Sequence, residues 1–132
     1  MVLLILLVLA LFVVQTVLPN RFRERPASGG GSALTAALGP RDDQPPLTRV
    51  GGRAARALAN MYEALPVFLT LALLNLFLGT GAVATTGATV FFVARLLYVP
   101  AYLSGVVGIR TLIWIASVVG LVMMLVPILD RI

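Results

Sequence analysis

Four apolar stretches, each long enough to cross a lipid bilayer, occupy most of the 132-residue chain. They lie at residues 2–18, 53–78, 83–103 and 109–129. The first, at about 1.5 Å per helical residue, extends about 26 Å, close to the thickness of the hydrocarbon core. Hydrophobic residues make up 60% of the chain, and a soluble domain of this size cannot bury so many of them. The sequence predicts an all-α integral membrane protein, a single domain (1–132) that forms a bundle of four transmembrane helices.

The segment 19–52 differs from its neighbours, because it holds five of the eight prolines and six of the twelve glycines. This composition is typical of a connecting loop. The segment lacks the Gly-Lys-Ser/Thr sequence that a nucleotide-binding loop requires. No basic residue precedes Arg21 and no small-x-small cleavage pattern precedes Pro19, so we expect the first span to be retained rather than removed as a signal peptide.

The arginines indicate how the chain is oriented in the membrane. Seven of the ten lie between Arg21 and Arg56, while the connection between the second and third spans holds none. Cytoplasmic loops collect basic residues, so the long loop is predicted to be cytoplasmic and both termini to lie outside. The net charge of +5 does not indicate nucleic acid, because these arginines lie between apolar blocks rather than on a polar surface.

The chain has neither cysteine nor histidine. Their absence excludes disulfides, zinc sites built from thiolate or imidazole, Cys or Ser-His nucleophiles and a histidine base, and we expect no metal site. Any chemistry must therefore use other side chains or a bound cofactor.

Polar side chains share one face of the second span. Arg53, Arg56, Asn60 and Glu63 follow one another at intervals of three, four and three residues. An ionisable side chain inside a bilayer is costly and requires a partner. We expect Glu63 to be paired inside the bundle, either in a binding site or in a structural ion pair with Arg95.

A second polar group lies on the third and fourth spans. Arg95, Tyr98 and Tyr102 again share a helical face, and Arg110 opens the fourth span. With these helices antiparallel, both groups lie at a similar depth. This predicts one polar pocket at the cytoplasmic end, with guanidiniums for carboxylates or a thiolate, a carboxylate for an amine, and phenols as hydrogen-bond donors.

Each of these residues also has a structural explanation. Arginines at a membrane boundary are often anchors that extend to the headgroups, and tyrosines or Trp114 can form an interfacial aromatic belt. The common depth and face favour a binding site, because anchors alone do not require Asn60 and Glu63.

The pattern Arg56-Ala57-x-x-Asn60-x-x-Glu63-x-x-Pro66-x-Phe68, followed by Arg95-x-x-Tyr98-x-x-x-Tyr102 and Arg110, resembles the MAPEG superfamily, the membrane-associated proteins in eicosanoid and glutathione metabolism. The resemblance covers about residues 41–115 and is strongest to the short bacterial members. It implies a left-handed four-helix bundle in the bacterial inner membrane. It also implies a homotrimer that binds glutathione as cofactor between neighbouring subunits.

The resemblance implies a role in glutathione binding for six residues: Arg56, Asn60, Glu63, Arg95, Tyr98 and Tyr102. Among them, Glu63 suits the γ-glutamyl amino group. Arg110 matches the arginine that stabilises the glutathione thiolate and is the catalytic candidate. Arg53, on the same helical face, is a further cofactor-binding candidate. The sequence departs from the family at Ala64, where several eicosanoid-synthesising members have a ligand-binding tyrosine, and at Leu58, where some have a polar contact.

The implied function is a glutathione-transferase-like or peroxidase-like membrane enzyme that acts on a lipophilic small molecule. A cation beside the thiol favours the thiolate, so the reaction needs no base. One alternative is a proton-coupled transporter of lipophilic cations that uses Glu63, which the arginines disfavour by repelling cations. The other is a non-catalytic membrane protein with the MAPEG fold. The expected partners are further copies of the chain and the bilayer.

Overall fold

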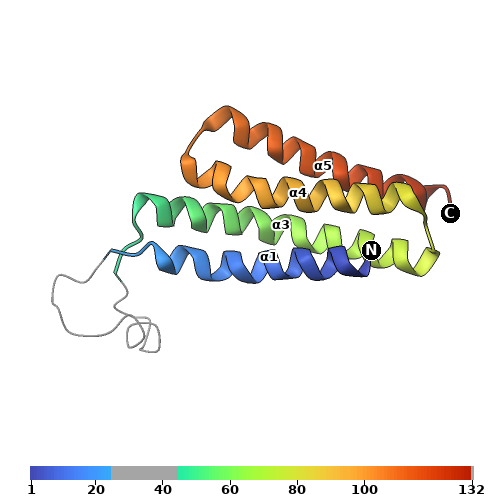
Figure 1. Ribbon diagram of the computed structural model, residues 1–132, viewed down its shortest axis with the longest axis horizontal. Coiled ribbons are helices and arrows are strands. Elements are labelled where there is room, and N and C mark those ends of the chain that lie inside the picture. The colour runs from blue at the N-terminus through green and yellow to red at the C-terminus, as the bar shows by residue number, and fades with distance from the viewer. Residues whose placement is uncertain (25–44, 132) are drawn as a thin grey trace.

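The computed structural model describes residues 1–24 and 45–131, and four helices make up most of this part of the chain. They are α1 (Val2–Arg21), α3 (Arg49–Leu78), α4 (Ala82–Ser104) and α5 (Val107–Leu129). The helices lie side by side along one long axis, and the chain reverses direction at each end of the bundle (Figure 1). Outside the helices, the described residues form one isolated β-bridge, between Arg23 and Leu47.

All four helices are long and apolar enough to cross a membrane. The most apolar 18-residue windows of α1 and α5 have mean hydropathies of 2.8 and 2.6. The prediction of an all-α, multi-pass membrane protein with four spans is confirmed.

Two helices extend into the predicted loop 19–52. Helix α1 continues through Pro19 to Arg21, and α3 begins at Arg49 rather than at residue 53. Thr48 is the reason for the earlier start, because its Oγ1 accepts a hydrogen bond from the Gly51 N–H (3.1 Å) at the helix N-terminus. The same hydroxyl donates to the Phe22 carbonyl (2.7 Å), which joins the start of α3 to the end of α1. The glycine-rich part of the predicted loop, at 28–32, lies outside the described residues.

The core of the bundle is built mainly around the inner face of α3. Met61, Phe68 and Ala72 are fully buried there, and Phe91 of α4 stacks on Phe68 with ring centroids 4.6 Å apart. These residues recur at helical spacing, so they turn one face of α3 towards the other helices. The polar residues near the start of α3, Arg53, Arg56, Asn60 and Glu63, are therefore directed to the rim of this core or outwards.

Helices α4 and α5 come into close contact at two glycines. A Cβ atom on Gly87 would lie 2.6 Å from the Gly120 carbonyl oxygen, and one on Gly120 would lie 2.7 Å from the Gly87 carbonyl oxygen. The two backbones are thus in direct contact, as small residues permit in membrane helices. This contact fixes α4 against α5, the two helices that carry the predicted tyrosines and Arg110.

A buried asparagine joins α3 to α5 near the same end of the bundle as this glycine contact. Asn75 Nδ2 donates to the carbonyls of Leu71 and Met124, each at 2.8 Å, and its Oδ1 accepts from the Thr80 hydroxyl. Both N–H groups and the oxygen of the Asn75 amide therefore have hydrogen-bond partners in the apolar interior. Asn75 is a structural residue that the sequence analysis did not single out.

Candidate functional site

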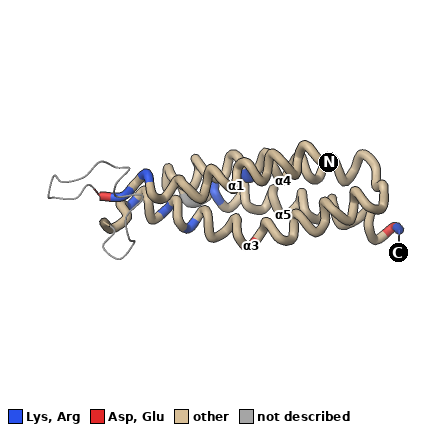
Figure 2. Tube along the Cα trace, turned by 90° about the horizontal axis from the view of Figure 1, so that it is seen from below, with Lys and Arg blue, Asp and Glu red and all other residues tan. Residues whose placement is uncertain are grey.

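The predicted site residues lie in the half of the bundle where α1 ends, α3 begins and α4 turns into α5, with Glu63 close to the middle of α3. Figure 1 shows this end of the bundle beside the grey trace. The described arginines are concentrated towards this end, whereas the opposite end carries Asp130 and Arg131 beside the C-terminus (Figure 2). The bundle is therefore strongly polarised along its axis.

A polar pocket of about 310 Å³ opens at this end. Residues of α3, α4 and α5 line it: Asn60, Tyr98, Tyr102, Arg110, Thr111 and Trp114. The Arg110 guanidinium lies over the Tyr102 ring, 5.0 Å from its centroid, and the Tyr98 and Tyr102 rings are 5.4 Å apart. None of the six described lining residues carries a carboxylate, so a cation and hydrogen-bond donors dominate the pocket.

Arg95 lies behind this pocket and is almost completely buried, with 2% of its surface exposed. Its guanidinium lies over the rings of Phe91 and Tyr98, at 5.2 and 5.5 Å from their centroids, which stabilises the charge through cation–π interactions. Its Nη1 donates a 2.5 Å hydrogen bond to Asn60 Oδ1, while its Nε has no hydrogen-bond partner among the described residues. No carboxylate in the described part of the chain forms an ion pair with Arg95. Glu63 interacts with Arg95 electrostatically without forming an ion pair, so it compensates the buried charge only in part and the potential at the pocket stays positive.

The bond from Arg95 also determines how Asn60 faces the pocket. A guanidinium only donates, so the Asn60 amide must accept with its oxygen. Its NH₂ group remains as the donor for a ligand. Asn60 and Arg95 together therefore present a donor backed by a positive charge, which suits a carboxylate or another anionic acceptor.

Arg56 and Glu63 lie on the outside of the single chain. Both are exposed, and Glu63 forms no ion pair with any residue that the structure describes. The predicted structural ion pair between Glu63 and Arg95 is wrong, because Arg95 bonds to Asn60 instead. The reason is the orientation of α3. Met61 and Ala64, which lie before and after Glu63 in the sequence, occupy the core, so the Glu63 side chain points away from it. Pairing of Glu63 in a binding site stays a prediction.

Comparison with known protein families identifies the family of the chain. The MAPEG family model matches residues 1–129 of the 132-residue chain. The chain belongs to the MAPEG family. The comparisons with curated proteins and with solved structures gave no match. Family membership confirms the resemblance seen in the sequence, and the family generally uses glutathione.

Two residues that line the polar pocket were not predicted as site residues. Trp114 was interpreted only as an interfacial anchor and Thr111 was not singled out, yet both line the pocket. The signal was present, because Trp114 follows Arg110 by four residues and therefore shares its helical face.

Arg53 occupies a different place from the other predicted site residues of this MAPEG chain. Its Nη1 donates to the Leu103 carbonyl (2.9 Å) in the last turn of α4, and it is not among the described residues that line the pocket. The departure at Ala64 also lies away from the pocket, because Ala64 packs in the hydrophobic core. Leu58, the other departure, is half-buried on α3.

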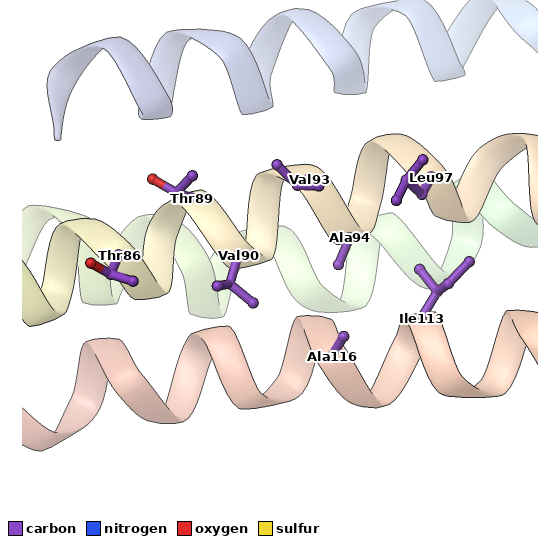
Figure 3. Close-up of a pocket in the computed structure, with 8 residues that line it drawn as sticks. All are labelled: Thr86, Thr89, Val90, Val93, Ala94, Leu97, Ile113 and Ala116. Carbon is purple, nitrogen blue, oxygen red and sulfur yellow. The ribbon is translucent and has the colours of Figure 1, made fainter.

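A second hollow, of about 340 Å³, lies between α4 and α5 (Figure 3). It is lined by Thr86, Thr89, Val90, Val93, Ala94, Leu97, Ile113 and Ala116. The hydroxyls of Thr86 and Thr89 donate to carbonyls of their own helix, at 3.0 and 2.9 Å. None of these eight residues is titratable, so this MAPEG chain has its candidate chemistry in the polar pocket.

Proposed function

We propose that this MAPEG protein is a glutathione-transferase-like or peroxidase-like membrane enzyme. Glutathione supplies a thiol that, as a thiolate, adds to a lipophilic electrophile or reduces a hydroperoxide. The polar pocket of α3, α4 and α5 is the proposed binding site, and the electrophile reaches it from the bilayer.

One observation carries this proposal: the pocket is lined by Arg110 and backed by the buried Arg95, and it has no carboxylate among its described lining residues. Such a site favours an anionic ligand. Glutathione has two carboxylates and an ionisable thiol, so its charge complements the pocket. The hydroxyls of Tyr98 and Tyr102 and the Asn60 amide supply neutral donors around it.

Arg110 is the proposed catalytic residue. Its guanidinium remains charged at any working pH, so a thiol held beside it loses its proton more readily. It belongs to the first turns of α5, where the positive end of the helix dipole also favours an anion. The Tyr102 ring under the guanidinium restricts where this charge can lie.

Arg56 and Glu63 complete the proposed site from the outer face of α3. They flank Asn60 along the helix at four and three residues, so they lie next to the pocket wall. In this position Glu63 suits the amino group of glutathione and Arg56 suits a carboxylate. Both would act across the contact with a neighbouring subunit.

Substitution of Asn60 by aspartate tests the site. Asn60→Asp replaces the NH₂ donor with an oxygen and adds a negative charge, while the acceptor for Arg95 is kept. We expect the Kd of glutathione to rise at least about tenfold, the scale of a lost hydrogen bond to a charged group. Isothermal titration calorimetry of the detergent-solubilised protein measures this change.

Asn20→Asp is the matched control, because Asn20 Oδ1 also accepts a hydrogen bond from an arginine, Arg23. Asn20 is exposed near the end of α1, and its substitution is expected to leave the Kd unchanged. Unaltered binding by Asn60→Asp would contradict the site. If the unmodified chain does not bind glutathione, the non-catalytic membrane protein becomes the better interpretation.

We also propose that the chain assembles as a homotrimer. Glu63 lies close to the middle of the 30-residue helix α3 and is exposed. A carboxylate at this depth is costly to expose to lipid, so a neighbouring subunit has to cover it. Native mass spectrometry in mild detergent should show three copies of the chain. A stable monomer across several detergents would contradict this assembly.

The proposed orientation places the arginine-rich end of the bundle in the cytoplasm and both termini outside, in a bacterial inner membrane. The chain has no cysteine, so a single introduced cysteine is a specific probe. In intact cells, a membrane-impermeant maleimide should label Ala82→Cys but not Ser32→Cys. Labelling of both positions, or of Ser32→Cys alone, would overturn this orientation.

A further inference from the structure

Arg53 joins the start of α3 to the turn between α4 and α5. Its Nη1 donates to the Leu103 carbonyl (2.9 Å). Leu103 lies in the last turn of α4, where the carbonyls have no N–H partner within the helix. Arg53 is half-buried and lies one helical turn after the Thr48 cap of α3. The bond therefore connects two helix ends that are 50 residues apart in the sequence.

The turn itself is shaped around the Arg53 guanidinium. Gly105 has a φ of +79°, in the left-handed region that favours glycine, and a Cβ atom there would lie 2.5 Å from the guanidinium carbon of Arg53. Gly105 is thus required both by the backbone conformation and by the presence of Arg53. The guanidinium packs directly against the backbone of the turn.

This turn carries the pocket residues on both sides. Tyr102 precedes Leu103, the residue that accepts the bond, and Arg110 follows Gly105 by five residues. The stacking of Arg110 on Tyr102 at 5.0 Å depends on how the end of α4 and the start of α5 are held relative to each other. A small displacement of the turn would move both residues that line the pocket.

From this geometry we infer that Arg53 is a positioning residue for the pocket: it holds the α4–α5 turn so that Tyr102 and Arg110 keep their stacked arrangement. It acts through the Leu103 carbonyl and the Gly105 backbone rather than by contact with the ligand. The inference rests on the proposed function for its effect on glutathione. The effect of Arg53 on the arrangement of Tyr102 and Arg110 does not depend on the proposed function.

Trp114 provides a direct measurement of the pocket. It is the only tryptophan of the chain and lines the pocket, so its fluorescence reports the local arrangement without any ligand. Arg53→Met keeps the apolar stem of the side chain and removes the donors and the charge. We expect this variant to shift Trp114 emission and its quenching by acrylamide, and to raise the Kd of glutathione at least about fivefold.

Two further variants separate positioning from general loss of charge or stability. Arg53→Lys retains one donor and the charge, and it should restore Trp114 emission and most of the glutathione affinity. Arg49→Met removes an exposed arginine one turn earlier on the same helix and should change neither measurement. Unchanged Trp114 fluorescence and quenching in folded Arg53→Met would overturn the inference, and so would failure of Arg53→Lys to restore them.

Gly105→Ala provides a second route that retains Arg53. The added methyl group is disfavoured by the left-handed backbone of Gly105 and also collides with the guanidinium, so it should shift Trp114 emission in the same direction as Arg53→Met. The Gly105→Ala shift should be smaller in an Arg53→Lys background than in the unmodified chain, because the flexible lysine can move aside. If Arg53→Met does not fold, this comparison decides, and equal shifts in both backgrounds overturn the inference. If no chain binds glutathione but Trp114 responds as described, the proposed function fails and the positioning role stands.

Discussion

Replacement of Arg110 by methionine is expected to reduce the kcat/KM of glutathione conjugation by about 100-fold or more, the scale seen when one preorganised electrostatic contact to a developing anion is removed. Methionine retains a similar length and removes the charge. Arg110 is the charged residue that lines the described pocket, and Arg95 behind it is already engaged with Asn60 and two aromatic rings. The remaining residues cannot therefore replace the charge beside the sulfur.

The test separates thiolate stabilisation from binding. The ultraviolet absorbance of bound glutathione reports its thiolate fraction, and stopped-flow measurement with a lipophilic aryl halide gives the rate of conjugation. Arg110→Met should reduce the thiolate fraction and kcat much more than it raises the Kd of glutathione. A change confined to KM would instead assign Arg110 to uniform binding of substrate and transition state.

Two control variants make the Arg110 result specific. Arg110→Lys keeps a positive charge without the planar guanidinium, so it should lie between the unmodified protein and Arg110→Met. Arg131→Met removes an arginine at the opposite end of the bundle (Figure 2) and should have no effect on the rate. Equal losses in Arg110→Lys and Arg110→Met would show that geometry, not charge, is the important property.

The sequence predicted the four helices well because their signal is large and local. Each span is a continuous apolar run. In the membrane interior, backbone N–H and C=O groups can form their hydrogen bonds only within regular secondary structure. Helix ends were predicted less well because they depend on single contacts. Thr48 starts α3 at Arg49 through its bonds to Gly51 and to Phe22, a residue of the preceding segment.

The spacing of the α3 polar residues predicted a common face but not its division into two rows. Residues seven apart on a helix differ by only about 20° in direction, whereas residues three apart differ by about 60°. Arg53 and Asn60 thus form one row, which contacts α4, and Arg56 and Glu63 form another, which is exposed. Which row turns inwards depends on the packing of Met61 and Phe68 in the core, and the polar spacing alone does not contain that information.

Contacts between helices were the least accessible to sequence analysis. Asn75 and Gly120 are single residues within apolar runs, and Gly87 lies among small residues and threonines. Small residues can indicate a packing surface, but not which helix packs on it. Their roles follow from which helices are neighbours in space. The bond from Asn75 to the Met124 carbonyl joins residues 49 positions apart, and the glycine contact joins residues 33 positions apart.

The contact between Gly87 and Gly120 gives the largest expected effect on stability. Gly87→Ala would place a methyl group 2.6 Å from the Gly120 carbonyl oxygen and 2.8 Å from Met123 Cβ, so α4 and α5 must separate. Overpacking of this kind destabilises a folded protein by about 1–3 kcal/mol, and backbone on the opposing side leaves little freedom to adjust. We expect a clearly lower apparent Tm for Gly87→Ala and loss of the folded protein for Gly87→Leu.

Gly108→Ala is the matched control for Gly87→Ala, because Gly108 also lies within a helix, α5, but a Cβ atom there meets nothing within 4 Å. Its replacement should leave the apparent Tm unchanged or raise it, since alanine favours the helix over glycine. Thermal unfolding in detergent, followed by circular dichroism, compares the variants, and equal Tm values for Gly87→Ala and Gly108→Ala would contradict the close contact.

Gly87→Ala should also weaken glutathione binding at temperatures where it remains folded, because α4 carries Tyr98 and Tyr102 and α5 carries Arg110. The contact between Gly87 and Gly120 thereby holds together the two helices on which the tyrosines and Arg110 of the pocket lie, at a point towards the opposite end of the bundle.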